Sequence, residues 1–156
     1  MTAAAAATAL GEQLQTTLHR EIPITRALAL VVRAYDGTRL TVAAPLAPNV
    51  NVHGTGFAGS LYSVAALCGW GMMYLQLIEA DIDGSIVIAD ADIKYLSPEH
   101  GELVARCDLA SHPDFAAAIA ALRQDGKARF ALDVSIGDVT APVARFTGRY
   151  AVRVRR

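Results

Sequence analysis

Four side chains capable of acid–base and hydrogen-bond chemistry stand directly before the most apolar segment of the chain. They are Asn49, Asn51, His53 and Thr55, and the 22 residues from 57 to 78 that follow carry no charge. A carboxamide can orient a water molecule, and histidine is the side chain whose ordinary pKa lies near neutrality, so it suits general-base work. The spacing therefore indicates a candidate acid–base centre at the start of an apolar helix.

The same four residues also have a purely structural interpretation. Asn49 and Asn51 could satisfy backbone groups in a turn, as asparagine commonly does. His53 could be a solvated loop residue, and Thr55 is a plausible N-cap of the helix, with a hydroxyl that could also take part in chemistry. The residues alone favour the structural role for the two asparagines.

The first turns of the apolar segment add groups that could hold a substrate. Backbone N–H groups around Gly59 and Ser60 would point out of the helix end, where they can bind a developing oxyanion, and Gly56 and Gly59 would allow close approach. Neither Ser60 nor Ser63 has a visible His–Asp relay, so a serine nucleophile is not expected. Tyr62 could bind a substrate carbonyl or pack across a subunit interface, and packing is the simpler expectation.

The elements that must position these residues can be predicted from hydrophobic periodicity. A helix over 57–78 would be about 33 Å long, enough to span a bilayer. Its serines, glycines, tyrosine and glutamine favour instead a central helix buried on nearly all sides. Before it, alternation over 28–34 and 40–46 predicts a β-hairpin around the turn at 36–38. After it, a strand is predicted within 87–95, with Val87 and Ile93 on its buried face. Further strands are predicted within 103–109, 128–136 and 144–154, with a short helix between Pro113 and Gly126.

These elements predict a single α+β domain over 1–156. Residues 1–13 are expected to be a frayed lead-in to a helix that ends near Pro23. Six antiparallel strands curled around one long helix satisfy every alternation, and that architecture is the hotdog fold. Because one sheet covers only one side of the helix, a second subunit is expected, as a dimer or a dimer of dimers.

Composition narrows the class of partner. The formal net charge of −1 gives no reason to expect nucleic acid, and no membrane partner is expected. Cys68 and Cys107 form no paired framework, so they are expected to be reduced and buried in a cytoplasmic protein, and neither is expected to act as a nucleophile. No His/Cys cluster has metal-ligand spacing, so neither a metal nor a cofactor is expected.

Cations gather on the predicted outward faces of the last two strands. They are Lys127, Arg129, Arg145, Arg149, Arg153, Arg155 and Arg156. The simpler interpretation is a soluble sheet face. The functional alternative is an electrostatic landing site for coenzyme A phosphates or for an acidic carrier protein.

The segment "APLAPNVNVHGTGFAGSLYSVAALCGWGMMYLQL" resembles the signature of a hotdog-fold thioesterase family that also occurs fused behind bacterial acetyltransferase domains. The family pattern is APL-x-PN, a hydrophobic residue and N, then GT-x-F-x-GS-L, then a helix with GW. The later "IVIADADIKYLSP" and "GKARFALDVSI" also resemble the family, so the similarity runs from about Leu14 to Val152. Ala58 departs from the pattern, because a second glycine is usual there.

The resemblance implies hydrolysis of acyl-coenzyme A or acyl-carrier-protein thioesters at a dimer-interface site, with the coenzyme A thioester as substrate. It does not identify the catalytic base. With the chemistry of the residues, the candidate catalytic residues are Asn49, Asn51, His53 and Thr55, and the candidate substrate-binding residues are Gly56, Phe57, Gly59, Ser60, Tyr62 and Ser63. Better understood hotdog thioesterases place a carboxylate early in the central helix, and residues 57–78 contain none. That absence favours one alternative, a non-catalytic acyl-binding or dimerisation module. It counts against a second, less favoured alternative, a hydroxyacyl-thioester dehydratase, because that chemistry generally needs a histidine with a carboxylate on the helix.

Overall fold

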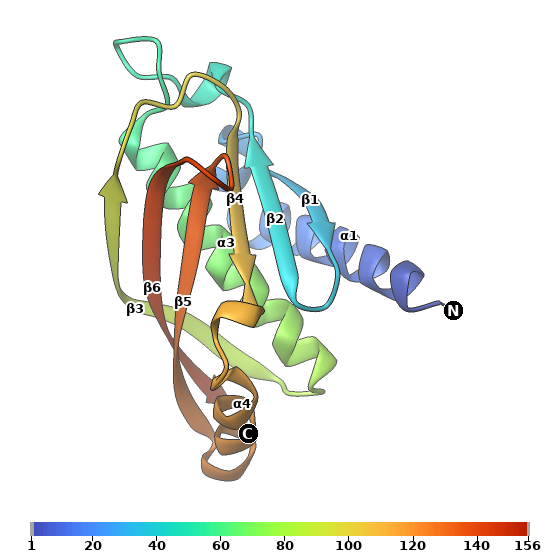
Figure 1. Cartoon of the computed structure of the whole chain (residues 1–156). Coiled ribbons are helices and arrows are strands. Elements are labelled where there is room, and N and C mark those ends of the chain that lie inside the picture. The colour runs from blue at the N-terminus through green and yellow to red at the C-terminus, as the bar shows by residue number, and fades with distance from the viewer. Residues whose placement is uncertain (1, 156) are drawn as a thin grey trace.

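The computed structural model describes residues 2–155 and has one sheet and one long central helix (Figure 1). The six strands form one antiparallel sheet in the order β1-β2-β4-β5-β6-β3. The helices are α1 (Ala3–Glu21), α2 (Ile24–Ala27), α3 (Ala58–Glu79) and α4 (Phe115–Asp125). The strands are β1 (Val31–Tyr35), β2 (Arg39–Ala44), β3 (Gly84–Tyr95), β4 (Leu103–Asp108), β5 (Lys127–Gly137) and β6 (Pro142–Val154). This is the hotdog fold, as the sequence predicted.

The core lies between α3 and the inner face of the sheet. β4, β5 and β6 alternate buried and exposed side chains, because successive residues of a strand point to opposite faces. α3 is long and apolar enough to span a membrane, yet 61% of its most apolar window is buried in the fold. That burial is typical of a core helix, which agrees with the interpretation favoured from the sequence.

Helix α1 differs from the sequence prediction at its start. It is regular from Ala3, with Thr2 as N-cap, so the stretch 3–13 is helical where a frayed lead-in was expected. The alanine-rich composition explains the helix, because alanine has the highest helix propensity. From this helix Gln15 reaches the outer edge of the sheet: its amide nitrogen donates to Leu30 O (3.0 Å), and its amide oxygen accepts from Val32 N (2.5 Å).

The predicted first strand was wrong at its beginning. The chain forms α2 and a turn before β1 starts at Val31, although Leu28 and Leu30 are still buried. A register shift between Val32 and Ala34 then turns Tyr35 inward and leaves Ala34 exposed, the reverse of the expected alternation.

Strand β3 is the second sheet edge and also departs from its predicted alternation. A register shift between Ile88 and Asp90 separates two halves of the strand. Before it Ile86 packs against the core, while Val87, predicted to be buried, is 59% exposed. After it Ile93 packs inward as predicted.

The core holds Tyr150 directly against α3. Its hydroxyl donates to Ala66 O (2.9 Å), and a Cβ atom at Gly69 would lie 2.2 Å from that hydroxyl oxygen. Real Cβ contacts are never that short, so only glycine lets the two elements approach this closely. Burial raises the pKa of Tyr150, which keeps the phenol protonated and able to donate.

Both thiols are expected to be unreactive in the folded protein. Cys68 and Cys107 are buried, and burial raises the pKa of Cys68 well above its ordinary value and that of Cys107 to about 12. A disulfide-exchange reagent at pH 8 should therefore label neither thiol in the native protein and both in denaturant. Rapid native labelling of one thiol would contradict this arrangement.

Candidate functional site

The start of α3 has no side-chain cap. Phe57 occupies the N-cap position without a capping hydrogen bond, so the predicted N-cap role of Thr55 is wrong. The first helical hydrogen bond runs from Leu61 N to Phe57 O (3.0 Å). The N–H groups of the three residues before Leu61 therefore point out of the helix end, where the helix dipole favours negative charge.

An aromatic ring forms one wall of this helix end. The Phe57 ring lies over Gly59, because a Cβ atom at Gly59 would be 2.5 Å from Phe57 Cε1. Phe57 is 52% exposed, and Ala58 beside it is exposed as well. The helix end thus combines backbone donors with an accessible apolar surface.

Asn51 organises the loop that leads to the helix. Its amide nitrogen donates to Thr55 Oγ1 (2.9 Å) and Gly56 O (3.2 Å), and its amide oxygen accepts from His53 N (2.8 Å) and Thr55 N (3.2 Å). The structure therefore brings Asn51 and Thr55 together, as predicted. All four contacts of this carboxamide lie within the loop, so its direct effect is to fix the shape of that loop.

His53 lies on the outer turn of the same loop. It is exposed, as is Val52 beside it, which is 96% exposed. Within residues 2–155 its imidazole has no hydrogen-bond partner. The structure thus does not bring the imidazole into the hydrogen-bond network that Asn51 makes with Thr55.

Asn49 fastens the loop to the body of the protein. Its side chain is 1% exposed, and its amide nitrogen donates to Leu28 O (2.9 Å) and Pro45 O (2.8 Å). Its backbone oxygen accepts from Phe57 N (2.7 Å). The amide oxygen is buried with no donor in the described part of the chain. The geometry gives this residue a structural role beside the helix end.

The remaining predicted residues lie along the first two turns of α3. Ser63 donates to Gly59 O (2.8 Å), so its hydroxyl is engaged with the helix backbone, and Ser60 is buried. Tyr62 packs edge-to-face on Phe146, with ring centroids 5.3 Å apart. The packing role favoured for Tyr62 agrees with this contact.

Two residues at this site were missed by the sequence reasoning. Tyr95, at the end of β3, donates to Ala58 O (2.8 Å), and partial burial raises its pKa. Glu99 contacts the loop, since Gly56 N donates to Glu99 O (2.7 Å) and a Cβ atom at Gly56 would lie 3.1 Å from Glu99 Cβ. Its carboxylate accepts from Gly101 N (2.8 Å). Glu99 thus brings a carboxylate-bearing residue from a distant segment into contact with the loop before α3.

One face of α3 is only partly covered by the rest of the chain. Its half-buried residues are Tyr62, Ala66, Leu67, Trp70, Tyr74 and Ile78. Trp70 and Tyr74 stack, with ring centroids 5.4 Å apart, on the wall of a hollow of about 730 Å³ between α1, α3 and β3. Within residues 2–155 β3 pairs only with β6, so its other edge is open. β3 lies beside this face of α3, since Trp70 Nε1 donates to Ile86 O (3.4 Å).

The sequence profile of the family described as "Putative thioesterase (yiiD_Cterm)" matches residues 11–154. The chain belongs to this thioesterase family. A solved "putative thioesterase" from Shewanella oneidensis is 36% identical, with 95% of this chain and 99% of that one covered and a TM-score of 0.84. A protein of unknown function from Chlorobaculum tepidum TLS is 30% identical over 96% and 97% of the two chains, with a TM-score of 0.89.

A solved structure with lower sequence identity has the same fold. A protein of unknown function from Pseudomonas aeruginosa, described as a "Probable Thioesterase", is 19% identical over 92% of this chain and 95% of that one, with a TM-score of 0.78. In a member of a thioesterase family, the uncapped end of α3 is a candidate site for binding a thioester carbonyl. Across residues 2–155, no group of three or more His, Cys, Asp or Glu side chains is arranged to hold a metal ion.

Proposed function

We propose that this protein hydrolyses thioesters of acyl-coenzyme A or acyl-carrier protein at the N-terminal end of α3. The observation that carries the proposal is the uncapped start of this apolar helix, which presents backbone N–H groups beside Phe57 and Gly59. A thioester carbonyl placed there would have its developing oxyanion stabilised by those donors.

The reaction needs a water molecule and a base. Water attacks the carbonyl carbon, the carbon–sulfur bond breaks, and the water's proton is taken by a base and passed to the leaving thiolate. The side chains suited to this role on the loops around the helix end are His53 and Glu99. Asn51 acts by holding the loop in shape, and the Phe57 ring fills the space beside Gly59 where a side chain would lie.

The proposal includes a homodimer, alone or paired further into a tetramer. The half-buried face of α3 and the open edge of β3 lie together, and both would be covered by a second copy. A strand that pairs with its own copy across a two-fold axis must run antiparallel to it. The Gly84 end of β3 would then lie beside the Tyr95 end of the other copy, next to that copy's start of α3.

The decisive experiment measures thiol release from acyl-coenzyme A of increasing chain length. Wild-type protein is expected to turn over at least one of these thioesters. Because a general base contributes about 10²–10⁴-fold, either His53→Ala or Glu99→Gln should lower kcat by roughly 100-fold or more. Asn51→Ala should also reduce activity, through loss of loop shape.

Glu102→Gln is the matched control for Glu99→Gln. Glu102 is a nearby exposed carboxylate that pairs with Arg33. It should leave kcat unchanged, and all variants should match the wild type in sedimentation. Absence of turnover with acyl ligands still binding would replace the hydrolase proposal with an acyl-binding module, the alternative favoured by the lack of a carboxylate on α3.

A further inference from the structure

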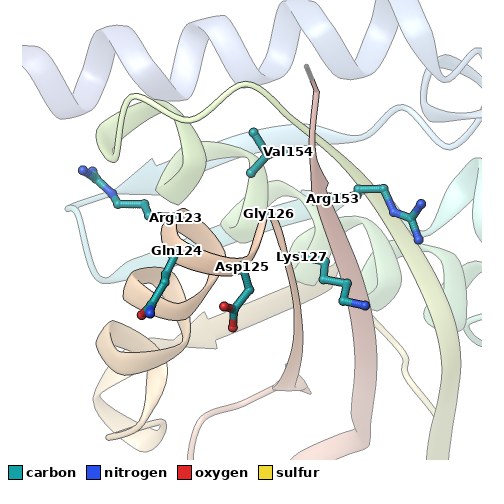
Figure 2. A pocket seen from close by; sticks show the side chains of 7 residues that line it. All are labelled: Arg123, Gln124, Asp125, Gly126, Lys127, Arg153 and Val154. Atoms are coloured by element: carbon teal, nitrogen blue, oxygen red, sulfur yellow. The ribbon is translucent and has the colours of Figure 1, made fainter.

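The outer face of the sheet carries a hollow whose charged lining residues are all cations. It encloses about 560 Å³ at one end of β3, β5 and β6, and its lining includes Ser85, Val87, Lys127, Arg129, Ala151 and Arg153. A second hollow adjoins it and shares Lys127 and Arg153 (Figure 2). The first of the two is called the basic hollow below.

The cations of the basic hollow lack acidic partners. Several arginines elsewhere on the surface have such partners, among them Arg149 with Asp90 and Asp92, and Arg39 with Asp108. Within residues 2–155, Lys127, Arg129 and Arg153 form no ion pair. Their positive charge is therefore available to an anion from outside the chain.

Strand register forces two of these cations together. Lys127 and Arg153 are direct partners across β5 and β6, and Figure 2 shows both side chains extending to the same side. Like charges in directly opposed positions are destabilising, so the sheet tolerates an unfavourable pair here. Arg123 points away from them, held by a hydrogen bond to Ala80 O at the end of α3. Such a local conflict is typical of a binding surface.

We infer that the basic hollow binds the phosphorylated nucleotide of coenzyme A. Three unpaired cations suit its phosphate groups, since phosphate forms strong charge-assisted hydrogen bonds with arginine and lysine. Val87 and Ala151 give the hollow an apolar part against which a flat base can lie. Binding of an acidic protein surface would require only positive charge on this face. A concave site with an apolar part fits a nucleotide better.

The basic hollow lies at the end of the sheet that would be close to the partner's site in the proposed dimer. This part of the inference rests on the proposed function. Ser85, Arg153 and Lys127 lie in register across β3, β6 and β5, with neighbouring strands about 4.8 Å apart. Antiparallel pairing of two β3 strands would bring the partner's helix end to this same end of the sheet. The nucleotide of coenzyme A would lie on the outer face of the sheet. Its flexible pantetheine arm would pass around the end of the sheet to the start of the partner's α3.

The test is calorimetric titration of the full-length protein with coenzyme A. Lys127→Ala combined with Arg153→Ala should weaken binding at least tenfold, and raised salt should weaken binding to the wild type, because salt screens exposed charges. Adenosine 3′,5′-bisphosphate should compete, and pantetheine should not. The matched control is Arg39→Ala, which removes an exposed arginine on another strand pair and should leave binding unchanged. The double variant should melt no lower than the wild type, since it removes a repulsive pair.

Hydrolysis assays separate this inference from the proposed function. For acyl-coenzyme A the double variant should raise KM with kcat unchanged, while hydrolysis of an acyl-N-acetylcysteamine thioester should not change. Coenzyme A binding that is unaffected in the double variant, or equally weakened in Arg39→Ala, would overturn the inference even if the protein is a thioesterase. Binding lost in the double variant without any thioesterase activity in the wild type would support the inference and refute the hydrolase. Loss of activity only with acyl-carrier protein would assign the hollow to an acidic protein instead.

Discussion

Replacing Gly69 with alanine is expected to destabilise the fold by about 3 kcal/mol, at the upper end of the range for overpacked cores. The added Cβ atom would lie 2.2 Å from the Tyr150 hydroxyl oxygen and 2.7 Å from its Cζ atom. Tyr150 is 1% exposed and donates to Ala66 O, so the ring has no room to retreat without losing that bond. Urea unfolding followed by circular dichroism measures the difference in the free energy of unfolding.

The matched control is Gly11→Ala in α1. A Cβ atom there would meet Val32 Cγ1 at 3.6 Å, an ordinary contact. Because alanine is favoured over glycine inside a helix, this variant should be more stable than the wild type by about 0.5–1 kcal/mol. If Gly69→Ala and Gly11→Ala change the free energy of unfolding equally, the close contact between Gly69 and Tyr150 is wrong.

Replacing Asn49 with aspartate is expected to cost about 3 kcal/mol or more of the free energy of unfolding. The two side chains have nearly the same volume, so the change preserves packing and alters only hydrogen bonding and charge. The variant loses the donors to Leu28 O and Pro45 O and would place a carboxylate oxygen against two carbonyl oxygens. Leaving a buried acceptor without a donor costs about 1–3 kcal/mol. Thermal and urea unfolding both measure this effect.

Asn51→Asp is the comparison that separates the two asparagines. Asn51 lies in a partly exposed loop, where water can replace lost contacts, so its cost in stability should be below about 1 kcal/mol. If Asn49→Asp folds as stably as Asn51→Asp, the proposed structural role of Asn49 is wrong.

Much of the fold could be predicted because a strand with one buried face repeats apolar residues at every second position. β4, β5 and β6 lie inside the sheet, and their alternation of apolar and polar residues survives unbroken. The errors fall on the edge strands, β1 and β3, where a register shift in each reverses which residues face inward. A bulge adds one residue without any apolar or polar signature, so periodicity alone could not locate it.

The candidate site was predictable only in its local part. The loop residues and the helix start are close in the sequence, and the structure confirms that Asn51 and Thr55 lie together. Tyr95 at the end of β3 and Glu99 after it reach the same place, and no local pattern signals a contact between segments so far apart. Whether Asn49 and Asn51 bind water or the protein's own backbone also depends on side-chain direction, which residue type does not determine.

Gln15 would limit growth of the sheet beyond the two copies of the proposed dimer. Its amide contacts Leu30 O and Val32 N in the way that a neighbouring strand would, so part of the outer edge of β1 is already capped by its own chain. A sheet with two open edges can add copies without limit, which leads to fibres. In the proposed dimer the two β3 edges are joined across a two-fold axis, so only the partly capped β1 edges of the described chain remain for a third copy. A single glutamine thus contributes to keeping the proposed assembly closed and resistant to polymerisation.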